Sequence, residues 1–75
     1  MYFVYILKRN DNRKTYIGYT SDLRRRLREH GNKNPEIIYY EAYKSEKDAR
    51  KREQILKQRG QTVRRLKERI GNSLK

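Results

Sequence analysis

The hydrophobic positions near the beginning of the chain follow the pattern of β-strands. Residues 2–7 read Tyr-Phe-Val-Tyr-Ile-Leu, and β-branched and aromatic side chains of this kind favour a strand. Residues 15–20 resume the pattern after residues 10–12, Asn-Asp-Asn, whose side chains favour turns. These segments predict a β-hairpin. A third strand is predicted over residues 36–43, where isoleucines and tyrosines cluster.

Hydrophobic residues at helical spacing predict three helices. The first begins at an N-cap, Thr20 or Ser21, carries Leu23 and Leu27 one turn apart, and ends at Gly31. Asp22 suits the positive end of this helix.

Capping residues mark the other two predicted helices. The second opens at Ser45, which forms a capping-box pattern with Asp48, and it ends at Gly60. The third is capped by Thr62 and has its apolar residues on one face. The tail from Gly71 is expected to fray. The predicted order is β-β-α-β-α-α, an α/β chain of the α+β kind.

Size and charge narrow the function classes. The chain has 75 residues and only 33% hydrophobic residues, so we expect one small domain over residues 1–75 with little room for a small-molecule cofactor. It carries 21 Lys and Arg against 9 Asp and Glu, a net charge of +12, which favours a polyanionic partner such as nucleic acid. The alternative is a basic surface that binds polyanions non-specifically and has no catalytic or specific binding site.

The same composition excludes other classes. The chain contains no cysteine, which excludes disulfides and cysteine-based zinc sites. No apolar run approaches the ~20 residues that cross a bilayer, and the first residues do not resemble a signal peptide. We therefore expect a cytoplasmic protein without a membrane partner.

Two polar residues stand on predicted buried faces of helices. Glu53 projects between Ala49 and Leu56, about 40° from Ala49 on a helical wheel. A carboxylate there is costly unless it is paired or coordinated, so an ion pair and a metal-ligand role both remain open. On the first helix, His30 falls about 20° from Leu23. It is either a structural histidine or a catalytic one.

Tyrosines gather on one face of the predicted hairpin. Phe3, Tyr5 and Leu7 share a face of the first strand, as Tyr16 and Gly18 do on the second. The absent side chain at Gly18 predicts space beside Tyr16 for a ligand or a backbone segment. Packing tyrosines and a β-bulge are the simpler alternatives.

Four short motifs follow one another along the chain. Residues 3–6 read Phe-Val-Tyr-Ile, residues 16–18 read Tyr-Ile-Gly, residues 20–27 match the run T-x-D-L-x-x-R-L, and residues 48–57 contain Glu53. In this order and spacing they resemble the first motif, the second motif, the run that follows it and the acidic helix of the GIY-YIG endonuclease superfamily. The resemblance extends from residue 2 to about residue 70. It is strongest to compact stand-alone members related to the N-terminal nuclease domain of bacterial excision repair, which suggests DNA repair.

The resemblance implies a three-stranded antiparallel sheet flanked by helices and a metal-dependent endonuclease that hydrolyses DNA phosphodiesters. Glu53 would hold one Mg²⁺ or Mn²⁺, and Arg26 would neutralise charge on the phosphate. The implied catalytic residues are Tyr5, Tyr16, Arg26, His30 and Glu53. The residues expected to contact nucleic acid are Tyr19, Arg24, Arg25, Arg28 and Lys57.

The sequence departs from the family pattern at several points. Phe3 replaces the glycine of the first motif, and Tyr19 stands where some relatives carry a lysine. Residues 31–35 form a shorter loop than usual, and no asparagine follows Glu53 at the distance that some relatives show. The alternative function is a non-catalytic nucleic-acid-binding module that keeps the fold. The expected DNA is selected by structure (branched, flapped or nicked) rather than by sequence, and the protein is expected to be a monomer.

Overall fold

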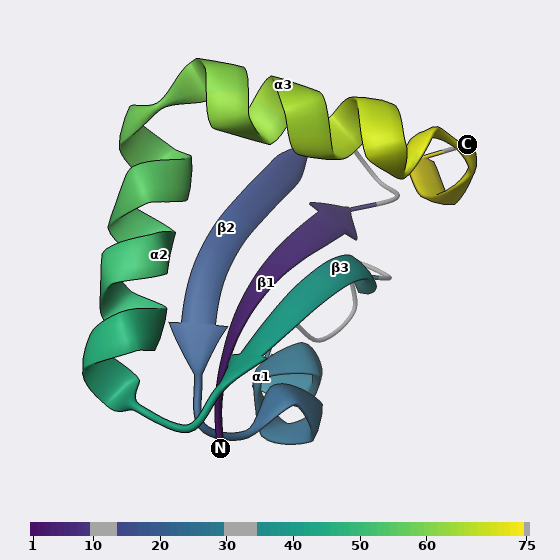
Figure 1. Ribbon diagram of the computed structural model, residues 1–75. Helices are drawn as coiled ribbons and strands as arrows, with labels where there is room; N and C mark the ends of the chain where they lie inside the picture. Colours follow the sequence, from purple (N-terminus) through teal and green to yellow (C-terminus); the bar gives the residue numbers. More distant parts are fainter. Residues whose placement is uncertain (10–13, 30–34, 75) are drawn as a thin grey trace.

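Three antiparallel strands form the sheet of the computed structural model, as the sequence predicts (Figure 1). Strand β1 (Tyr2–Arg9) lies between β2 (Thr15–Thr20) and β3 (Pro35–Tyr43), in the order β2-β1-β3. Both outer strands pair antiparallel with β1. The structure describes residues 1–9, 14–29 and 35–74. The predicted turn at residues 10–12 and the predicted end of the first helix at residues 30–31 lie outside this part.

Helices cover both faces of the sheet, and the predicted order β-β-α-β-α-α is confirmed (Figure 1). Helix α1 (Leu23–Glu29) follows β2, whereas α2 (Glu46–Gln58) and α3 (Gly60–Arg69) follow β3. No helix formed by the described residues has the length and apolar character that a membrane crossing requires.

The core lies between the sheet and the pair α2 and α3. Val4 and Ile6 of β1 are almost fully buried there against Ala49, Leu56 and Leu66. Side chains alternate along a strand, so Tyr5 points to the opposite face, which α1 covers. One face of the sheet therefore carries the apolar core, and the other carries Tyr5.

A β-bulge shifts the register of β3. Ile6 pairs with Tyr39, but the next residue, Leu7, pairs with Ile37, so the chain has one extra residue at this point. After the bulge, Tyr39, Glu41 and Tyr43 share the face of Ile6 and therefore point toward α2.

The cap of the first helix differs from the prediction. The helix begins at Leu23, and the Asp22 carboxylate accepts a hydrogen bond from the Arg25 N–H at 3.1 Å. Thr20 stabilises the turn that precedes the helix, because its hydroxyl oxygen accepts a hydrogen bond from the Asp22 N–H at 3.1 Å. Asp22 is thus the cap. Ser45 precedes α2 without a side-chain capping bond, so the predicted capping box does not form.

The boundary between the last two helices was also predicted wrongly. Gly60 begins α3 instead of ending α2, and Thr62 lies within α3. Arg59 alone separates the helices. Its extended backbone (φ −112°, ψ 90°) turns the chain, while its N–H still bonds the Ile55 carbonyl at 2.9 Å. Residues Gly71–Leu74 form a 3₁₀ turn rather than a frayed tail.

Candidate active site

The first element of the site is a hydrogen-bonded pair on the α1 face of the sheet. Arg26 Nε donates to the Tyr5 hydroxyl at 2.9 Å, and Arg26 Nη1 donates to Glu29 at 3.0 Å. The bond to Tyr5, followed by the bond to Glu29, raises the pKa of Arg26 above its ordinary value. Tyr5 is only 3% exposed, so its ring is held by its neighbours, and its hydroxyl oxygen holds the guanidinium in place. The remaining N–H groups of Arg26 are suited to phosphate oxygens.

Gly18 makes this pair possible. Tyr5 and Gly18 are directly opposite each other on β1 and β2. A Cβ at Gly18 would lie 2.5 Å from the Tyr5 hydroxyl oxygen and 2.7 Å from its Cζ. The predicted free space beside Tyr16 is therefore taken by the Tyr5 ring, and the prediction of a ligand-accessible gap there was wrong.

Tyr16 lies on the same face, two residues before Gly18 on the edge strand β2. It is 38% exposed, and the Arg9 guanidinium carbon lies 5.8 Å from its ring centroid. Tyr16 is thus open to solvent whereas Tyr5 is not.

Glu53 lies on the other face of the sheet. Its side chain is 19% exposed, as its position between Ala49 and Leu56 predicts, and its carboxylate lies 3.6 Å from Lys57 Nζ. Tyr19 also belongs to this face. It accepts a hydrogen bond from Arg50 Nε at 3.0 Å, and the guanidinium carbon is 5.4 Å from its ring centroid. Tyr19 is therefore engaged by α2, and its contact with nucleic acid stays a prediction.

The structure places the two halves of the site, Arg26 with Tyr5 and Glu53 with Lys57, on opposite faces of the sheet. Among the described residues, no hydrogen bond or ion pair joins Arg26 or Tyr5 to Glu53. The sheet lies between them, because Tyr5 faces α1 and Glu53 belongs to α2 on the opposite face. His30, the remaining predicted catalytic residue, lies outside the described residues.

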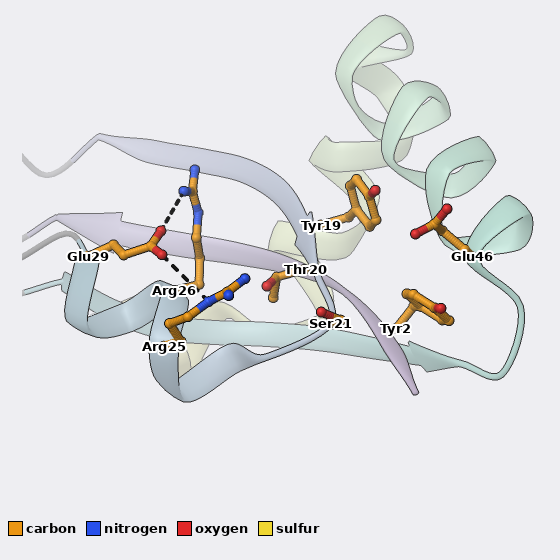
Figure 2. A pocket seen from close by; sticks show the side chains of 8 residues that line it. All are labelled: Tyr2, Tyr19, Thr20, Ser21, Arg25, Arg26, Glu29 and Glu46. Atoms are coloured by element: carbon orange, nitrogen blue, oxygen red, sulfur yellow. Dashed lines mark hydrogen bonds and ion pairs between the residues drawn. The ribbon is translucent and has the colours of Figure 1, made fainter.

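A groove of about 230 Å³ lies at the end of β2 (Figure 2). Arg25, Arg26 and Glu29 approach it from α1, and Tyr19 and Glu46 approach it from the other side. Arg25 pairs with Glu29 at 3.6 Å. The remaining lining residues are Tyr2, Thr20 and Ser21.

The other predicted DNA contacts lie on helix surfaces. Arg24 and Arg28 are exposed on α1, as is Arg25. Lys57 is on α2, with 54% of its side chain exposed. Cations of α1 therefore lie beside the groove, and one cation of α2, Lys57, lies beside Glu53.

The donor set around Glu53 decides which kind of metal could bind. Within residues 1–9, 14–29 and 35–74, no group of three or more His, Cys, Asp or Glu side chains could form a cage. Glu53 offers a single half-buried carboxylate. Mg²⁺ and Mn²⁺ favour oxygen ligands, and Mg²⁺ keeps several of its waters, so one carboxylate fits such a hydrated ion.

Glu41 is a second half-buried carboxylate, and it was not predicted as a site residue from the sequence. Arg52 donates to both of its oxygens, at 2.9 and 3.1 Å, and Tyr39 and Tyr43 donate at 2.6 and 2.5 Å. The signal in the sequence is a glutamate between two tyrosines at i±2, which share one face of a strand. The cluster connects β3 to α2 through Arg52, the residue before Glu53.

The Glu41 cluster shifts the pKa values of its carboxylate and of both tyrosines. Burial raises the pKa of Glu41, but the bonds from Arg52, Tyr39 and Tyr43 outweigh burial and hold it below its ordinary 4.5. Burial, together with the bond to Glu41, raises the pKa of Tyr39 and raises that of Tyr43 to about 12. The carboxylate is thus held charged and both phenols neutral.

Comparison with known proteins identifies the family. No curated protein and no solved structure matches the chain. The model of one family, described as the GIY-YIG catalytic domain, matches residues 1–68, nearly the whole chain. These residues include all four motifs and both halves of the site. The chain therefore belongs to the GIY-YIG family, whose members are nucleases.

Proposed function

We propose that residues 1–75 form a single-domain, metal-dependent endonuclease that hydrolyses DNA phosphodiesters and selects DNA by structure rather than by sequence. The observation that carries the proposal is the Arg26 guanidinium, held on Tyr5 above Gly18. Family membership and the net charge of +12 support DNA as the substrate. Branched, flapped or nicked DNA, a monomeric enzyme, a cytoplasmic location and a role in DNA repair belong to the same proposal.

Phosphodiester hydrolysis needs a cation for developing negative charge and an activated water. Arg26 supplies a permanent charge and N–H donors that can bind two phosphate oxygens. The different exposures of the tyrosines divide their roles. Tyr5 is buried and accepts the Arg26 N–H, so it positions the guanidinium. Tyr16 is exposed and can contact the attacking water or the phosphate. His30 is the proposed acid for the leaving oxygen.

Glu53 is the residue that would hold Mg²⁺ or Mn²⁺. A bound divalent ion supplies Lewis-acid stabilisation of the phosphate and lowers the pKa of a coordinated water. The Glu53 side chain is 19% exposed, so its carboxylate is half-buried but still open to solvent. These properties support a cation-binding role.

Glu53→Gln tests the proposal, because it keeps the shape of the side chain and removes its charge. We expect cleavage of a panel of labelled DNA structures in Mg²⁺ or Mn²⁺ to be lost while DNA affinity is retained. Glu68→Gln, an exposed glutamate on α3, is the matched control and should cleave normally. Cleavage by Glu53→Gln at the wild-type rate would contradict the proposed role.

One observation favours the alternative, a non-catalytic DNA-binding module. Glu53 already has a cationic partner in Lys57, and it lies on the opposite face from Arg26. The same panel distinguishes the two functions. Binding by the wild-type protein without cleavage of any DNA structure in either metal would establish the module.

A further inference from the structure

Helices α2 and α3 meet at a corner of the fold, away from the end of β2 (Figure 1). A second groove lies at this corner. It has a volume of about 430 Å³ and an apolar floor formed by Ile17, Leu56 and Val63. Among the described residues, its charged lining residues are all cations: Lys57, Arg64 and Lys67. Tyr5, Tyr16, Arg26 and Glu53 do not line it.

The cations of this groove have few anionic partners. Lys57 lies near Glu53, but no ion pair is found for Arg64 or Lys67 within the described part of the chain. Arg64 and Lys67 are three residues apart on α3, so their side chains are neighbours on its surface. Lys67 is only half-exposed, and its aliphatic stem can lie along the apolar floor. Neighbouring cations repel each other unless an anion joins them.

The basic surface continues across the corner between the helices. Gly60 lines this groove and also an adjacent hollow that contains Arg59 and Arg65. Together the two hollows are lined by five cations, which belong to the end of α2, the residue between the helices and α3. An extended polyanion fits this arrangement better than a single small anion.

We propose that the α2–α3 corner binds the phosphodiester backbone of the DNA, with Lys57, Arg64 and Lys67 contacting successive phosphates. The inference rests on the proposed function, which makes DNA the polymer. Lys57 lies 3.6 Å from Glu53, so a backbone in this groove passes directly beside the proposed metal ligand. The floor of the groove packs against deoxyribose, the apolar part of the backbone. DNA therefore extends from the β2 edge along α2 to α3.

Gly60 offers a clean test of this surface. A Cβ at Gly60 meets no atom within 4 Å, so a longer side chain can be introduced without a clash. Gly60→Glu places a negative charge between the two hollows, and Gly60→Gln introduces nearly the same shape without the charge. We expect Gly60→Glu to weaken DNA binding at least tenfold relative to Gly60→Gln. The measurement is fluorescence anisotropy with labelled DNA, without divalent ions.

A salt titration tests the same groove by charge removal. Arg64→Ala combined with Lys67→Ala should make the slope of log K against log salt shallower by about two, because each phosphate contact contributes about 0.9. Lys47→Ala combined with Lys51→Ala removes the same charge from the exposed side of α2 and should keep the wild-type slope. Equal slopes for the two double variants, or equal affinities for the two Gly60 variants, would overturn the inference.

These measurements separate the failure of the inference from that of the proposed function. DNA binding is measured without divalent ions, so it does not depend on cleavage or on Glu53 as a ligand. If the groove variants bind and cleave as the wild type does, the inference fails alone. If the wild type never cleaves but the groove variants lose affinity, the nuclease proposal fails alone.

Discussion

Gly18→Ala is the substitution that the geometry of the site predicts most sharply. The new Cβ would lie 2.5 Å from the Tyr5 hydroxyl oxygen, 2.7 Å from Cζ and 3.2 Å from Cε2. Non-bonded carbon atoms settle at about 3.5–4.0 Å. The end of the Tyr5 ring must therefore move by about 1 Å. The ring is 3% exposed, so this movement displaces neighbouring atoms.

The displacement should affect both stability and activity. Overpacking of a filled site typically costs about 1–3 kcal/mol in the free energy of unfolding. The movement also shifts the oxygen that accepts the Arg26 Nε–H at 2.9 Å. A misplacement of about 1 Å in a catalytic constellation can lower turnover about 10²-fold. We expect a loss of this size in single-turnover cleavage, with a far smaller change in DNA affinity.

Urea unfolding and single-turnover cleavage at saturating enzyme are the two assays. Gly71→Ala is the control, because a Cβ at Gly71 meets no atom within 4 Å and the substitution restricts the unfolded chain. If Gly18→Ala unfolds at the wild-type urea concentration and cleaves at the wild-type rate, the close approach of Tyr5 to Gly18 does not control the site.

Two further predictions concern charged groups. Arg26→Ala should lower turnover by at least about 10²-fold with a small effect on DNA affinity. Arg24→Ala, at an exposed position of the same helix, is the control and should weaken binding slightly while turnover is kept. If the two variants change turnover and affinity equally, Arg26 is an ordinary surface charge. The Glu41 cluster should make stability depend on pH: because the folded protein holds the pKa of Glu41 below 4.5, the stabilisation is present above that pH and is lost as the pH falls through the lowered value. Urea unfolding across this range should show the loss in the wild type and not in Glu41→Gln, and a parallel decline in both proteins would contradict this role.

Local sequence patterns were sufficient for most of the fold. Alternating β-branched and aromatic residues placed all three strands, and the apolar spacing of Ala49 and Leu56 placed α2 on the core. The same spacing put Glu53 on a half-buried face, which its 19% exposure confirms. Its role as a metal ligand stays a prediction, as do the catalytic roles of Tyr5, Tyr16 and Arg26.

Features that depend on tertiary contacts were not predictable from local patterns. Gly60 resembled a helix terminator, but the extended backbone of Arg59 makes the turn, so Gly60 begins the next helix. The space at Gly18 was predicted to admit a ligand or a backbone segment. The Tyr5 ring fills it instead, and the direction of that ring depends on Arg26, twenty-one residues away in the sequence. The Glu41 cluster needs Arg52 from a different element, and no periodicity within β3 reveals that partner.

The edge position of β2 has a consequence for the motions of the molecule. β2 has a strand neighbour on one side alone, and α1 follows it after Ser21 and Asp22. Segments of this kind open locally at a lower free energy than the whole domain. Opening of β2 would carry α1 with it and would separate Arg26 from Tyr5. It would also break the bond between Tyr19 and Arg50 and the packing of Ile17 on the core. Amide hydrogen exchange in β2 therefore measures the free energy that holds the site and this side of the core together.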